Sequence, residues 1–134
     1  MPHKILVIDD DPDIRDAITM ILESQEYVVV SACDGIEGLA TLKAENPDLI
    51  ILDLMMPKMD GFGVCRKLED PRWSKYKDTP ILILTSVRED ASRRRYELEV
   101  GLELDVDDYI EKPMSPDILL ERVNILIKKK KSGC

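Results

Sequence analysis

Residues 48–61, Asp48-Leu-Ile-Ile-Leu-Asp-Leu-Met-Met-Pro-Lys-Met-Asp-Gly61, indicate the class of fold. Its apolar run, residues 49–52, is bounded by polar residues, which is typical of a strand buried on both faces. Asp53 follows at the carboxyl end of this strand, where parallel α/β sheets place their chemistry. An alternative interpretation is that Asp53 only caps the helix that comes next, since aspartate is a common cap.

The composition narrows the class of protein. The chain has 134 residues, 44% of them hydrophobic and 34% charged, so we expect residues 1–134 to form one domain with its own core. A net charge of -8 argues against nucleic acid or an anionic membrane as a direct partner. No apolar run approaches the roughly 20 residues needed to cross a bilayer. No signal peptide is visible either, so we expect a cytoplasmic protein, with Cys33 and Cys65 as small core residues.

The rest of the chain alternates short apolar runs with helical patterns. The expected strands are residues 5–8, 27–30, 49–52, 81–84 and 106–110. A helix is expected after each strand, and the fourth, within residues 88–104, has a thin apolar stripe that predicts weak anchoring. This alternation predicts a doubly wound parallel sheet with helices on both faces. Five strands favour the flavodoxin-like order 2-1-3-4-5.

Polar residues follow the ends of these strands. Asp9 and Asp10 end the first strand, and Asp53 ends the third, its neighbour in the predicted order. Thr85 ends the fourth strand and Lys112 follows the fifth, so all five side chains are expected at one edge of the sheet. Three carboxylates in one place repel each other unless a cation offsets them, and oxygen ligands favour Mg²⁺ or Mn²⁺. Such a site suits phosphoryl transfer, with Asp53 as the candidate nucleophile.

These residues closely resemble the receiver domain of two-component response regulators. The resemblance rests on four motifs in order, which are Asp9-Asp10, residues 53–61, Thr85-Ser86 and residues 107–113, and it covers essentially the whole chain. It implies that Asp53 accepts a phosphoryl group from a sensor histidine kinase or a phosphotransfer protein. It also implies a regulatory domain that is no enzyme beyond catalysing its own phosphorylation and dephosphorylation.

The resemblance also implies the ligands of the Mg²⁺ ion. Asp10 would bind the ion directly and Asp9 through a water molecule. Asp53 itself and the backbone carbonyl of Met55 would complete the protein ligands.

The resemblance further implies how phosphorylation is transmitted. Thr85 and Tyr109 match the family's switch pair, and Pro113 follows a peptide bond that is usually cis in the family. The expected output surface is formed by the fourth helix, the fifth strand and the fifth helix. It would act on an output domain, a downstream protein or a second phosphorylated copy. The segment around residues 97–105 is longer than usual, which leaves the shape of the fourth helix open.

Two other functions share parts of this pattern. A phosphohydrolase of the haloacid-dehalogenase type also uses an aspartate nucleophile and Mg²⁺, but it needs a second aspartate two residues later, where this chain has Met55. A flavodoxin-like flavin-binding module needs a first loop that cradles a phosphate. Here that loop is Asp9-Asp10-Asp11-Pro12, which would repel an anion.

Overall fold

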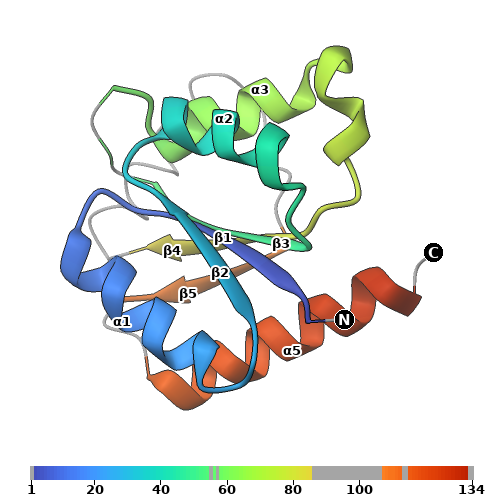
Figure 1. Ribbon diagram of the computed structural model, residues 1–134. Coiled ribbons are helices and arrows are strands. Elements are labelled where there is room, and N and C mark those ends of the chain that lie inside the picture. Colours follow the sequence, from blue (N-terminus) through green and yellow to red (C-terminus); the bar gives the residue numbers. More distant parts are fainter. Residues whose placement is uncertain (1, 55, 57, 86–106, 113–114, 133–134) are drawn as a thin grey trace.

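The strands form one parallel sheet. The computed structural model describes residues 2–54, 56, 58–85, 107–112 and 115–132. Within these residues five strands pair in the order β2-β1-β3-β4-β5, which confirms the predicted fold class (Figure 1). The strands are β1 (Lys4–Ile8), β2 (Val28–Ala32), β3 (Leu49–Asp53), β4 (Ile81–Thr85) and β5 (Asp108–Glu111).

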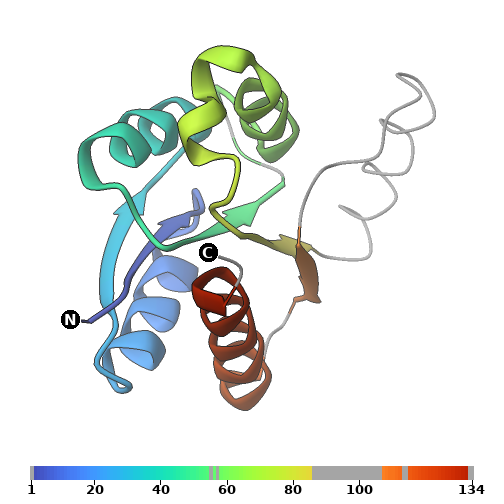
Figure 2. The ribbon, with the colours of Figure 1, turned by 90° about the vertical axis from the view of Figure 1, so that its right-hand side faces the viewer.

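Helices cover both faces of this sheet. Figures 1 and 2 show α2 and α3 on one face, together with a short 3₁₀ helix, and α1 and α5 on the other. The elements are α1 (Pro12–Glu23), α2 (Gly35–Glu45), α3 (Gly61–Glu69), the 3₁₀ helix η1 (Pro71–Tyr76) and α5 (Pro116–Ser132). The expected fourth helix falls in residues 86–106, which lie outside the described residues.

The sheet is apolar on both faces because helices cover both. In β1, Leu6 and Ile8 pack into the core cluster under α2 and α3. Ile5 and Val7 alternate with them and pack into the cluster under α1 and α5. Each of these four side chains is at most 1% exposed, which explains why the strand is a continuous apolar run in the sequence.

Aspartates set where the first three helices begin. The carboxylates of Asp11, Asp34 and Asp60 each accept a hydrogen bond from a backbone N–H in the first turn of α1, α2 and α3. The turns between β1 and α1 and between β2 and α2 are short, and each ends at such a cap. They place the carboxyl ends of these strands next to helix N-termini.

The strands β2 and β5 differ from the prediction by two residues at one end, whereas β1, β3 and β4 differ from it by one residue. The second was expected over residues 27–30, but β2 spans Val28–Ala32, because Ser31 and Ala32 continue the pairing with β1. The fifth was expected over residues 106–110, but β5 spans Asp108–Glu111. The Asp107 carboxylate accepts the N–H of Ile81 at 2.9 Å, so a side chain takes a bond of the first residue of β4.

The segment 70–80 contains η1, because Asp70 caps its N-terminus and Pro71 starts it. One local feature was predicted incorrectly. Cys33, expected in the core, is exposed, whereas Cys65 is buried as predicted. Among the described helices none is long and apolar enough to cross a membrane.

Candidate functional site

The carboxyl ends of β1 and β3 bring three carboxylates together. The two strands are neighbours, with Ile8 in register with Leu52, so the residues that follow lie side by side. One carboxylate oxygen from each of Asp9, Asp10 and Asp53 lies within 4.8 Å of the other two. Asp9 and Asp53 are buried, at 0% and 2% exposure, while Asp10 is exposed. The convergence expected from the sequence is therefore present in the structure.

Lys112 contacts both buried carboxylates. Its Nζ lies 3.3 Å from Oδ1 of Asp53 and 3.4 Å from Oδ2 of Asp9. The backbone N–H of Lys112 donates to the carbonyl of Thr85 at 2.6 Å, which fixes the lysine to the end of β4. The ammonium group of Lys112, which follows β5, thus contacts the carboxylates that follow β1 and end β3.

Burial makes the Asp9 charge costly. The pKa of Asp9 is raised from 3.8 to about 6; burial is the largest cause of the rise, and the nearby charge of Asp53 contributes to it. The Asp11 N–H, which donates to Oδ1 of Asp9 at 2.9 Å, and the Lys112 ammonium act against this rise. These two contacts therefore stabilise the ionised carboxylate of Asp9 by less than its burial destabilises it.

The donor set fits a hard divalent cation. Among the residues that the structure describes, three carboxylates face one ammonium group, so this part of the site carries excess negative charge at neutral pH. All its ligand atoms are oxygens, which Mg²⁺ and Mn²⁺ prefer. Asp10 is exposed, so the cluster is open to solvent on one side. The carbonyl of Met55, expected as a further ligand, lies outside the described residues.

The alternative that Asp53 is only a helix cap is excluded. Asp60 caps α3, with its Oδ1 accepting the Gly63 N–H at 2.9 Å. The start of α3 also packs closely on the end of β3, since Gly61 N–H donates to the Leu54 carbonyl at 2.9 Å. A Cβ at position 61 would lie only 2.6 Å from the Asp53 carbonyl oxygen. Glycine is needed there for this close approach.

The expected switch residues lie on the two strands beyond the cluster. Thr85 is the last residue of β4, is 6% exposed and is in register with Glu111 of β5. Tyr109, two residues earlier on β5, is half-buried and packs against the core under α2 and α3. Pro113, with its expected cis bond, and the expected fourth helix lie outside the described residues.

Two arginine contacts were not predicted from the sequence. Arg15 on α1 donates from Nη1 to the backbone carbonyl of Asp9 at 2.7 Å. Arg122 on α5 binds both carboxylate oxygens of Asp108 at 2.8 and 2.7 Å, which ties β5 to α5. Arg15 could have been found from its position on the first helix, close in sequence to the acidic loop of residues 9–11.

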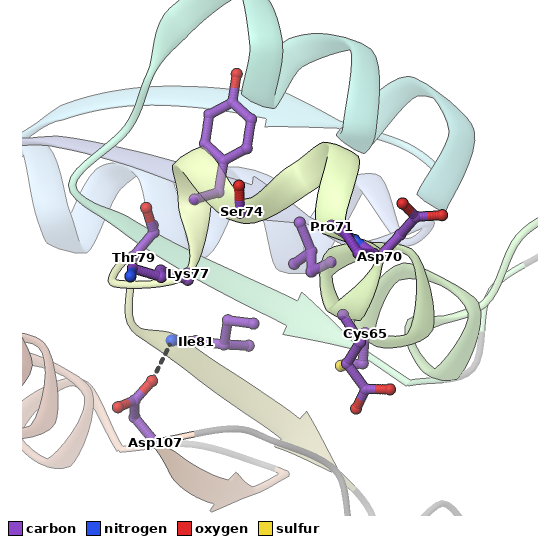
Figure 3. A pocket seen from close by; sticks show the side chains of 11 residues that line it. Cys65, Asp70, Pro71, Ser74, Lys77, Thr79, Ile81 and Asp107 are labelled. Atoms are coloured by element: carbon purple, nitrogen blue, oxygen red, sulfur yellow. Dashed lines mark hydrogen bonds between the residues drawn. The ribbon is translucent and has the colours of Figure 1, made fainter.

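A separate hollow lies at the opposite end of the sheet. It has a volume of about 340 Å³ and lies between α3, η1 and the starts of β4 and β5. Figure 3 shows Cys65, Ser74 and Asp107 on its walls, with the Asp107 carboxylate bound to the N–H of Ile81. None of the residues that line it belongs to the acidic cluster, which consists of Asp9, Asp10 and Asp53.

Comparisons with known proteins agree on one family. The family model described as "Response regulator receiver domain" matches residues 5–124. A protein described as a probable transcriptional regulator from Porphyridium aerugineum is 44% identical over 95% of this chain and 49% of its own length. A protein described as a DNA-binding dual master transcriptional regulator from Synechocystis sp. is 40% identical over 94% of this chain and 49% of its own length.

A solved structure agrees with this match. The chemotaxis protein CheY4 of Vibrio cholerae superposes with a TM-score of 0.78 and 32% identity, covering 94% of this chain and 99% of that one. The chain thus spans nearly all of that structure, but only about half the length of the curated relatives it matches.

Proposed function

The chain belongs to the response regulator receiver domain family of two-component signalling, and from this we propose that Asp53 is its phosphoacceptor. The observation that carries the proposal is the position of Asp53, buried at a strand end with the Lys112 ammonium 3.3 Å from its Oδ1. Two further carboxylates, those of Asp9 and Asp10, lie beside it. Residues 1–134 would act as one module, located in the cytoplasm as expected from the sequence.

In the proposed reaction an Asp53 carboxylate oxygen attacks phosphorus. A bond forms between that oxygen and phosphorus, while the bond from phosphorus to the donor's histidine nitrogen breaks. The nitrogen leaves with the electron pair and takes up a proton. Positioning and charge neutralisation do most of the work in such transfers. Lys112 is placed to offset negative charge on the transferred phosphoryl group.

The acidic cluster would hold Mg²⁺ through Asp9, Asp10 and Asp53. When bound, the ion supplies positive charge that offsets the carboxylates and the incoming phosphoryl oxygens. Asp9 and Asp10 are then needed as ionised oxygen donors. The raised pKa of Asp9 supports this assignment, because a charge that burial disfavours is what a bound cation stabilises.

Thr85 and Tyr109 would transmit the change. Phosphorylation adds about 1.5 to 2 negative charges and three acceptor oxygens. The Thr85 hydroxyl ends the strand beside that of Asp53, so we propose that it donates a hydrogen bond to the phosphoryl group. Its movement would leave space that Tyr109 fills, and the surface around β5 and α5 would change.

Receiver domains of this family pair with histidine kinases. We propose a sensor histidine kinase or a phosphotransfer protein as the phosphoryl donor here. The signal would pass to an output region like the other half of the longer relatives, to a separate downstream protein, or to a second copy in a phosphorylation-dependent dimer. The receiver itself, with a net charge of -8, is not expected to contact nucleic acid.

Intact-mass spectrometry tests the proposal. The protein is incubated with acetyl phosphate and Mg²⁺, and the expected product carries one added phosphoryl group. The same incubation with a chelator should give far less product, because the carboxylates are then not offset. Asp53→Ala should not be labelled, and labelling of this variant at the wild-type level would overturn the proposal.

A further inference from the structure

Every polar atom of Asp9 is engaged by a different partner. Its backbone N–H donates to the carbonyl of Ala32 at 3.1 Å, and its Oδ1 accepts the Asp11 N–H at 2.9 Å. Its Oδ2 lies 3.4 Å from Nζ of Lys112. Its backbone carbonyl accepts Nη1 of Arg15 at 2.7 Å. A residue held at four points has little freedom to reorient its carboxylate.

Arg15 is the partner that comes from the first helix. It lies six residues after Asp9 and is half-buried. Its own backbone N–H donates to the Asp11 carbonyl at 3.0 Å, so both its backbone and its guanidinium bind the acidic loop. Asp9 is fully buried, and a buried carbonyl at a strand end needs a hydrogen-bond donor. A charged donor makes this bond stronger than a neutral one.

We propose that Arg15 is a positioning residue for the divalent-cation site. By holding the Asp9 carbonyl, it fixes the turn from which the Asp9 and Asp10 carboxylates approach Asp53. The inference rests on the proposed function, because it concerns the cation that the acidic cluster would bind. It gives a role to a residue that contributes no carboxylate to the cluster.

The direction in which Mg²⁺ affinity changes on removal of Arg15 distinguishes a positioning role from a purely electrostatic one. Arg15 is cationic, so its charge alone repels a bound cation, and its removal would tighten Mg²⁺ binding. If Arg15 positions Asp9 instead, its removal loosens the ligands and weakens binding. Loss of a residue that orients a metal ligand typically lowers metal affinity by about 10- to 100-fold.

Calorimetric titration of the metal-stripped protein with Mg²⁺ measures this sign. The variants are Arg15→Met, which removes donor and charge, and Arg15→Lys, which keeps the charge and one donor. Arg72→Met is the matched control, because Arg72 lies on η1, is exposed and forms an ion pair with Asp70. We expect binding to be at least about tenfold weaker in Arg15→Met, intermediate in Arg15→Lys and unchanged in Arg72→Met. Unchanged or tighter binding by Arg15→Met would overturn the proposal.

A second measurement needs no metal. The Asp11 amide donates to Oδ1 of Asp9, so its hydrogen exchange reports whether the Asp9 carboxylate stays in place. In Arg15→Met we expect faster exchange at Asp11 and unchanged exchange in β3. Equal acceleration throughout the sheet would show a general loss of stability and would overturn the proposal. Absence of Mg²⁺ binding in the wild type would instead overturn the proposed cation site. Hydrogen exchange at the Asp11 amide would still show whether Arg15 keeps Asp9 in place.

Discussion

Asp9→Asn should make the metal-free protein more stable at neutral pH. Burial holds the pKa of Asp9 at about 6 instead of 3.8, so the folded protein binds this proton more tightly than the unfolded chain does. The contribution of Asp9 to the stability of the folded protein is therefore fully present below about pH 3.8. It is lost as the pH rises through about 6. Above that pH the wild type contains a charged group that its surroundings disfavour.

The magnitude follows from the two pKa values. The difference between 3.8 and about 6 corresponds to about 3 kcal/mol of unfolding free energy. Asparagine keeps an oxygen to accept the Asp11 N–H but gives up the ion pair with Lys112. We therefore expect a gain of about 1 to 3 kcal/mol at neutral pH, or about 3 to 5 °C in Tm for each kcal/mol.

Urea and thermal unfolding in the presence of a chelator measure this gain. The gain should be present at about pH 7.5 and nearly absent at about pH 4, where Asp9 of the wild type is protonated. Asp16→Asn, at an exposed position on α1, serves as the matched control and should change little at either pH. A variant that is less stable than the wild type at about pH 7.5, or equally stabilised at both pH values, would show that the charge of Asp9 does not destabilise the metal-free protein.

Three further predictions concern the cation, the start of α3 and nucleic acid. Mg²⁺ should raise the Tm of the wild type, with a gain in stability of about 2.7 kcal/mol at 100 times Kd, and should raise that of Asp10→Asn much less; an unmoved wild-type Tm would contradict the cation site. Gly61→Ala should cost about 1 to 3 kcal/mol in urea unfolding, because its Cβ would meet the Asp53 carbonyl oxygen at 2.6 Å. Gly63→Ala should cost less, because its Cβ meets the Met59 side chain, which can move. Residues 1–134 alone should give no sequence-selective gel shift with DNA, given their net charge of -8, and a salt-sensitive, selective shift would contradict this.

The sheet and the acidic cluster were predictable because they follow from topology. Continuous apolar runs such as residues 49–52 identify strands buried on both faces. The doubly wound order makes β1 and β3 neighbours, so Asp9 and Asp53 must lie close together. The polar residues at the strand ends are exceptions to the apolar pattern, and they mark the site for that reason.

The remaining features depend on contacts that side-chain patterns do not encode. Arg15 binds a backbone carbonyl, and every residue of the chain has one, so no residue type marks the partner. The Asp107 carboxylate accepts the N–H of Ile81, a contact that the alternation of apolar and polar residues does not predict. Cys33 follows β2 and makes its contact with Glu37 at the surface, although a small thiol is usually a core residue.

Chemical mapping of the phosphorylated residue tests whether Asp53 is the phosphoacceptor. The protein is phosphorylated with acetyl phosphate and Mg²⁺ and then reduced with borohydride, which converts an aspartyl phosphate to homoserine. Peptide sequencing by mass spectrometry then locates the modified residue. We predict homoserine at position 53 and at no other aspartate. Homoserine at position 9 or 10, or an unmodified Asp53 in protein that carries a phosphoryl group, would contradict the account.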